Sequence, residues 1–162
     1  MLTLFYLFLE GLSKKYAARR INERSMEPEE GLLLRCKLHI RGGRRRLRQG
    51  KIAAGIVTIY DAMTAALEWY IISPERKKRL KIRDGEDLNN DRTLYEILVR
   101  SKIVDGSFDY NAFDRVVERA LHEEMPCYDF TSVLKSIEDF MTQLGIMPFD
   151  ENKLPTEDPS TF

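Results

Sequence analysis

The sequence predicts an all-α protein, an up-and-down bundle of four to five helices. Two observations support this fold class: apolar residues recur at spacings of three and four along most of the chain, and no segment alternates as a strand would. With 162 residues, 43% of them hydrophobic and 32% charged, the chain can bury a core without a metal or a disulfide. We expect one bundle domain over residues 27–147.

Residues 1–26 are expected to form an N-terminal extension or a docking helix. Five apolar residues have helical spacing there: Leu2, Phe5, Leu9, Leu12 and Tyr16. Such a helix can pack on the domain, on a second copy or on a membrane surface. The apolar run over residues 2–9 is too short to span a bilayer, and its basic residues follow it, unlike those of a signal peptide. The alternative is that Met26 is the natural start.

A helical hairpin is expected to open the domain. Its first helix has five inward positions: Leu33, Cys36, Ile40, Gly43 and Leu47. The second runs over residues 51–72 and is apolar over most of its girth, so it should be the central helix of the core. It has one polar seam, made of Thr58, Asp61, Ala65 and Glu68. Ser73 and Pro74 end it, because the residue before a proline is disfavoured in the helical region.

Two adjacent glycines lie in the middle of the first helix. Gly42 and Gly43 each cost about 1 kcal/mol relative to alanine in a helix interior. We expect them to permit close approach of the second helix through three small residues: Ala53, Ala54 and Gly55. A local break in the first helix is the alternative.

The middle of the chain should connect the hairpin to a third helix. Residues 74–92 are highly charged and are predicted to form a solvated connection, helical at its start. Thr93 and Glu96 have the spacing of a capping box for a helix that stops before Gly106.

Two more helices and a tail are expected to follow. Asp109 can cap a helix over residues 110–124, which Pro126 ends. The last helix should cover residues 130–144, and residues 148–162 are expected to be a flexible acidic tail.

Charge is distributed unevenly although the net charge is zero. Residues 1–51 carry 13 Lys and Arg and 5 Asp and Glu, a net +8, whereas residues 93–162 carry 6 and 14, a net −8. This asymmetry is typical either of a nucleic-acid face or of oppositely charged elements that lie side by side. Cys36 and Cys127 lack metal-ligand spacing, which predicts buried thiols and a reducing, cytoplasmic location. A disulfide between them is the alternative.

Most enzyme signatures are missing. The sequence has no phosphate-binding glycine loop, dinucleotide fingerprint, zinc spacing or Gly-x-Ser-x-Gly elbow. A calcium loop starting at Asp87 fails, since Arg92 stands where glycine is needed and Leu98 where a bidentate carboxylate is needed. We therefore expect no metal or other cofactor.

Residues 32–71, LLLRCKLHIRGGRRRLRQGKIAAGIVTIYDAMTAALEWYI, resemble the opening hairpin of HEPN domains. That hairpin usually has a leucine- and arginine-rich helix, a short Gly-containing turn and a helix with Tyr, Asp or Tyr, Ala and small residues. Gly50 matches the turn, and the second-helix signature is Tyr60, Asp61, Ala62, Ala65 and Ala66. The resemblance covers a quarter of the chain and implies an up-and-down bundle that often dimerises.

Many HEPN members are ribonucleases that use an Arg and, four to six residues later, a His. Arg115 and His122, with six residues between them, fit this spacing, although Val116 stands where the family commonly has a polar residue. Helical spacing places Arg115, Arg119 and His122 within roughly 60° of one another, facing out of the bundle. In a dimer cleft, His122 would move the proton and Arg115 would stabilise the phosphate charge. The alternative is a solvated helix surface.

A second basic surface is predicted on the first hairpin helix. Four arginines lie opposite its apolar positions and suit phosphates: Arg41, Arg44, Arg45 and Arg48. A solvated or internally paired surface is the alternative, and His39 is expected at the surface or an interface. The leading hypothesis is a HEPN-like, non-catalytic and homodimeric interaction or regulatory module with a protein partner. The competing one is a metal-independent, toxin-like ribonuclease that binds RNA.

Overall fold

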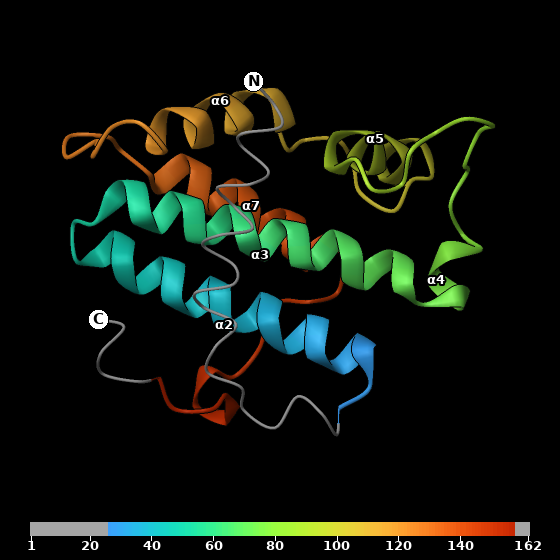
Figure 1. The fold of residues 1–162 in the computed structure, drawn as a ribbon, viewed down its shortest axis with the longest axis horizontal. Coiled ribbons are helices and arrows are strands. Elements are labelled where there is room, and N and C mark those ends of the chain that lie inside the picture. The colour runs from blue at the N-terminus through green and yellow to red at the C-terminus, as the bar shows by residue number, and fades with distance from the viewer. Residues whose placement is uncertain (1–25, 158–162) are drawn as a thin grey trace.

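The computed structural model describes residues 26–157, which form an all-helical bundle (Figure 1). Its elements are α2 (Pro28–Arg48), α3 (Ile52–Ile72), α4 (Pro74–Lys77), α5 (Asp91–Arg100), α6 (Tyr110–Ala120), α7 (Thr131–Gln143) and the 3-10 turn η2 (Glu151–Lys153). None of the described residues forms a strand, so the predicted fold class is confirmed. The expected docking helix in residues 1–25 lies outside the described residues.

The helices α2 and α3 form the predicted antiparallel hairpin. Pro28 occupies the first turn of α2, followed by Glu29 and Glu30, which suit the positive end of the helix dipole. Gly50 has a φ of 77°, a left-handed conformation that glycine adopts without strain, and it turns the chain into α3. In α3, 12 of 21 residues are buried, and this helix contacts α2, α4, α5, α6 and α7. It is the central helix, as predicted.

Close contact between α2 and α3 explains the mid-helix glycines. A Cβ on Gly43 would lie 2.5 Å from Ile59 Cδ1 and 3.3 Å from the Gly55 carbonyl oxygen, and a Cβ on Gly55 would lie 2.7 Å from Leu47 Cγ. The predicted close approach is therefore confirmed at Gly43 and Gly55. The alternative of a break is wrong, because α2 continues without interruption from Pro28 to Arg48.

Two details of the hairpin differ from the prediction. Ala54 is exposed and takes no part in the close approach. Ala65, expected in the polar seam of α3, is buried, and the polar neighbour Thr64 is half-buried instead, donating from its hydroxyl to Asp91 Oδ2 at 2.9 Å. The seam therefore faces α5 in part.

The helices α5 and α6 each begin directly after a capping residue. The α5 helix begins at Asp91, where the Asn90 side chain accepts from the Thr93 amide. The predicted capping box at Thr93 and Glu96 is wrong, because Thr93 already lies inside the helix. The Asp109 cap of α6 is confirmed, since its carboxylate accepts from the Ala112 amide at 2.9 Å.

An aromatic cluster joins α5, α6 and α7. Its members are Tyr95, Phe108, Tyr110, Phe113 and Phe140, all of them buried. The Tyr95 hydroxyl donates to the Phe108 carbonyl oxygen, so this buried polar group is satisfied. Phe113 of this cluster also contacts Tyr60 of α3, so the cluster fixes the position of α6 against α3.

The segment after α7 returns along α2. It starts with the buried residues Leu144 and Ile146, and Lys37 Nζ of α2 lies 5.6 Å from the centre of the Phe149 ring. Figure 1 shows this part of the chain, in red, beside α2. Residues 148–157 of the predicted acidic tail thus contact the bundle, and residues 158–162 lie outside the described residues.

Candidate functional site

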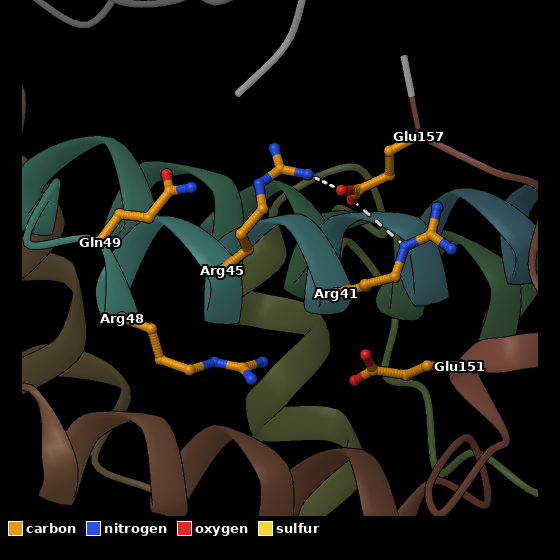
Figure 2. A pocket seen from close by; sticks show the side chains of 6 residues that line it. All are labelled: Arg41, Arg45, Arg48, Gln49, Glu151 and Glu157. Atoms are coloured by element: carbon orange, nitrogen blue, oxygen red, sulfur yellow. Dashed lines mark hydrogen bonds and ion pairs between the residues drawn. The ribbon is translucent and has the colours of Figure 1, made fainter. Parts of the chain in front are cut away.

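The arginine row on α2 consists of Arg41, Arg44, Arg45 and Arg48. Figure 2 shows Glu157 between the guanidiniums of Arg41 and Arg45. Arg41 donates from Nε to Glu157 Oε1 at 3.2 Å and from Nη2 to the carbonyl oxygen of Pro155 at 2.7 Å. One carboxylate near the end of the described chain therefore binds two successive turns of α2.

Arg44 joins three elements. Its Nε donates to Glu138 Oε1 of α7 at 2.6 Å, and its Nη1 donates to Glu151 Oε1 of η2 at 2.8 Å. Arg48 is exposed, and its Nε donates to the Arg44 carbonyl oxygen of the same helix at 3.3 Å. Carboxylates thus pair with the row from Arg41 to Arg45, whereas Arg48 at its C-terminal end donates to a backbone oxygen of its own helix.

Internal pairing, one of the two alternatives for this surface, is observed at Arg41, Arg44 and Arg45. Their side chains keep 14 to 22% of their surface exposed. The Nε and Nη1 atoms of Arg45 are buried, so its pair with Glu157 is shielded from water more than a surface ion pair is. The pairs therefore neutralise part of the charge of the row, and nucleic-acid binding by the row stays a prediction.

A cavity of about 320 Å³ lies along the row (Figure 2). It is lined by Arg41, Arg45, Arg48, Gln49, Glu151 and Glu157. Every lining residue is charged or an amide, so the cavity suits a polar, charged ligand.

The other predicted site lies at the end of α6. Arg115, Arg119 and His122 are all exposed, as predicted, while Phe113 and Val117 are buried on the opposite side of the helix. The helix ends at Ala120, however, and not at residue 124. His122 therefore lies in the turn after the helix, and the helical angle does not define its direction relative to Arg115.

Arg119 is already engaged at this end of α6. Its Nε donates to Glu123 Oε2 at 2.9 Å, an exposed pair on the same segment. Next to it is a cavity of about 390 Å³, with a lining that includes Arg119, Met125, Cys127, Tyr128 and Asp129. Burial raises the pKa of the Tyr128 hydroxyl, and the charge of Arg119 opposes that rise. No periodicity or motif in the sequence indicates this hollow, which depends on the turn that follows α6.

His39 lies on the side of α2 that faces the polar seam of α3. Its Nδ1 is 3.9 Å from Asp61 Oδ2. Burial and the nearby cations Arg35 and Arg46 lower the pKa of His39 to about 4, whereas burial raises the pKa of Asp61 to about 6. At neutral pH the imidazole is therefore uncharged, and this contact is not an ion pair. Two titratable side chains thus lie next to each other where α2 contacts α3.

The two cysteines have different surroundings. Cys36 is buried, its thiol is 3.9 Å from Met141 Sδ, and burial raises its pKa to about 12. Cys127 is exposed, so the prediction of a buried thiol is wrong for this residue. Both thiols are free, and the alternative of a disulfide between them is not observed.

Three further findings concern metals, membranes and known proteins. Within residues 26–157, no three His, Cys, Asp or Glu side chains come together as a metal site would require. No helix in that same range has the length and apolar character needed to cross a membrane. No protein-family model, curated protein or solved structure matches the chain. Function is therefore inferred from the contacts and charges described above.

Proposed function

We propose that the protein is a non-catalytic, homodimeric helical interaction module of HEPN-like type. One observation carries this proposal: Arg119, which lies between the candidate catalytic residues Arg115 and His122 in the sequence, is engaged with a carboxylate of the same chain. The Nε of Arg119 donates to Glu123 Oε2 at 2.9 Å. A catalytic arginine has to bind the developing charge of the reacting group, and an internal carboxylate competes with that charge.

The hairpin supplies the second support. The segment that resembles HEPN domains forms two 21-residue helices that pack closely at Gly43 and Gly55. Only five of the 21 residues of α2 are buried, so this helix offers a long surface to a second copy or to a protein partner. A cytoplasmic location belongs to the same proposal.

A metal-independent ribonuclease is the second candidate. It is favoured by the exposure of Arg115 and His122 at one end of α6, beside the 390 Å³ cavity. In this hypothesis, two subunits combine their exposed ends into one cleft. His122 acts as general acid or base there, and Arg115 stabilises the charge on the phosphate.

Self-association is tested by sedimentation velocity over a range of protein concentrations. We expect a dimer at the higher concentrations, with reversible dissociation on dilution. A chain that stays monomeric throughout contradicts both candidates, since each depends on a second subunit.

Catalysis is tested with labelled single-stranded RNA in the presence of EDTA. We expect the wild type to leave the RNA intact. The comparison includes His122→Ala, Arg115→Ala and, as a control at an exposed site on α7, Lys135→Ala. Cleavage by the wild type and the control, but by neither of the first two variants, would establish the ribonuclease instead.

A further inference from the structure

The arginine row is part of an unusually dense group of cations. Five of the eight residues from Arg41 to Arg48 are arginines. Three carboxylates form ion pairs with the row: Glu138, Glu151 and Glu157. Glu157 is shared by two guanidiniums, so the four arginines of the row keep a net positive charge even with these three carboxylates in place.

The ligand of the row in the folded chain is an extended acidic stretch. Residues 150–157, here named the acidic segment, place Glu151, the Pro155 carbonyl and Glu157 against the row. Arg41 and Arg45 are one helical turn apart, about 6 Å along the axis. The acidic segment therefore places oxygen acceptors at several points along α2. The phosphates of an extended polyanion would be spaced along the helix in a similar way.

The lining of the row distinguishes between kinds of polyanion. A bound peptide or protein gains most of its affinity from apolar and aromatic anchors in a desolvated centre, and the six lining residues include no apolar side chain. A phosphate backbone needs only cationic donors, and arginine binds phosphate through two parallel hydrogen bonds. The surface thus favours phosphates over a peptide.

We propose that the arginine row is a binding site for the phosphate backbone of single-stranded nucleic acid, and that the acidic segment occupies this site in competition. Phosphates and the carboxylates of the acidic segment are acceptors for the same guanidiniums, so binding of one displaces the other. Backbone binding of this kind reads no base sequence. The inference extends the proposed function, because it adds a ligand and a means of control to a non-catalytic module.

The test uses a fluorescently labelled single-stranded DNA of about 20 nucleotides, long enough for several phosphate contacts. Without 2′-hydroxyls, this probe cannot be cleaved by the ribonuclease mechanism, so the experiment measures binding alone. We compare Glu151→Gln/Glu157→Gln with the matched variant Glu75→Gln/Glu96→Gln, which removes two exposed carboxylates far from the row in the sequence. Fluorescence anisotropy at low salt gives the dissociation constants of the full-length proteins.

We expect Glu151→Gln/Glu157→Gln to bind the probe about tenfold more tightly than the wild type. Glu75→Gln/Glu96→Gln changes the net charge equally but leaves the row covered, so its affinity should change by less than about threefold. Equal affinity of the two double variants overturns the proposal. So does an oligoglutamate peptide that displaces the probe as efficiently as unlabelled DNA of equal charge, because the site would then be one for acidic peptides.

A second comparison does not require the acidic segment to be altered. Arg48→Gln in the wild-type chain should weaken binding about threefold and lower the slope of log affinity against log salt by about 0.7, as loss of one phosphate contact to a single strand predicts. Arg79→Gln, at an exposed arginine of the connection after α4, should change neither. Equal behaviour of these two variants, or no binding by the wild type at low salt, contradicts the proposal. Sedimentation of the same samples reports separately on the proposed dimer.

Discussion

The arginine row of α2 and the exposed end of α6 present similar patterns in the sequence. Each has arginines three or four residues apart on a helix, opposite an apolar stripe. In the folded chain the row is covered by carboxylates that come from 94 to 116 residues away, whereas Arg115 and His122 stay exposed. The same local pattern thus gives a surface paired with distant carboxylates in one place and an exposed surface in the other.

The difference shows that helical spacing determines only which way an arginine faces. Whether the arginine can bind an external ligand depends on which part of the chain packs against that side of the helix. The segment after α7 returns along α2 and brings Glu151 and Glu157 to the row. At the end of α6, by contrast, Arg119 pairs with a carboxylate only four residues away. Substitutions in the arginine row and at the exposed end of α6 can therefore measure how much the pairing of the row depends on tertiary packing.

The largest change in the free energy of unfolding should come from a substitution that separates α2 from α3, because the whole arginine row lies on α2. In Gly55→Ala the new Cβ would lie 2.7 Å from Leu47 Cγ and 3.1 Å from the Leu47 backbone nitrogen. We expect a loss of about 1 to 3 kcal/mol in the free energy of unfolding, as for other overpacked cores. Urea unfolding followed by circular dichroism measures it.

Gly31→Ala is the matched control. Gly31 lies in α2, and a Cβ added there would have no neighbour within 4 Å. Alanine should therefore stabilise the protein by up to about 1 kcal/mol through its helix propensity. Equal destabilisation by both substitutions would contradict the close approach at Gly55.

The next effect compares the two arginine surfaces directly. Arg44→Ala removes the contacts with Glu138 and Glu151 as well as the packing of the side-chain stem, and we expect a loss of about 1 to 2 kcal/mol in unfolding free energy. Arg115→Ala, at the exposed surface, should stay within about 0.5 kcal/mol of the wild type. Chemical unfolding of both variants measures the difference. Equal losses would mean that the covered and open surfaces do not differ energetically.

The smallest effect concerns pH and the side of α2 next to the row. His39 has a folded pKa of about 4 against an ordinary 6.5, so the unfolded chain binds this proton first as the pH falls. Stability from His39 is therefore present above pH 6.5 and is lost towards pH 4. Because 29% of the side-chain surface is exposed, we expect His39→Gln to gain only about 1 kcal/mol relative to the wild type over this range.

Asp61→Asn should show the opposite trend. The folded pKa of Asp61, about 6, lies above its ordinary 3.8, so the folded chain binds this proton first. The wild type gains stability from Asp61 as the pH falls through 6, and the variant lacks that gain. Relative to the wild type, Asp61→Asn should therefore become less stable between pH 7 and pH 4. Chemical unfolding at several pH values measures both variants, and parallel curves for all three proteins would contradict the assignment.

Helix positions were predictable because apolar spacing is a local property. The expected second helix over residues 51–72 is observed as Ile52–Ile72, and the last, over 130–144, as Thr131–Gln143. The end of α6 was not predictable, although its apolar pattern continues to Leu121. There, the Ala53 amide of α3 donates to the Glu124 carbonyl oxygen at 3.4 Å, and Met125 adopts a φ of 58°. A tertiary contact and a turn thus replace the last helical turn.

The sequence by itself determined the all-α fold class, the central position of α3 and the outward direction of both arginine groups, since each follows from which residues share a face of one helix. Only the tertiary structure decided which charges meet. Arg41 and Glu157 are 116 residues apart, and no periodicity relates them. Their contact exists because the chain after α7 packs its apolar residues on the bundle and so carries its carboxylates along α2. An arginine cluster can be read from a sequence, but its pairing with carboxylates depends on distant residues that only folding brings together.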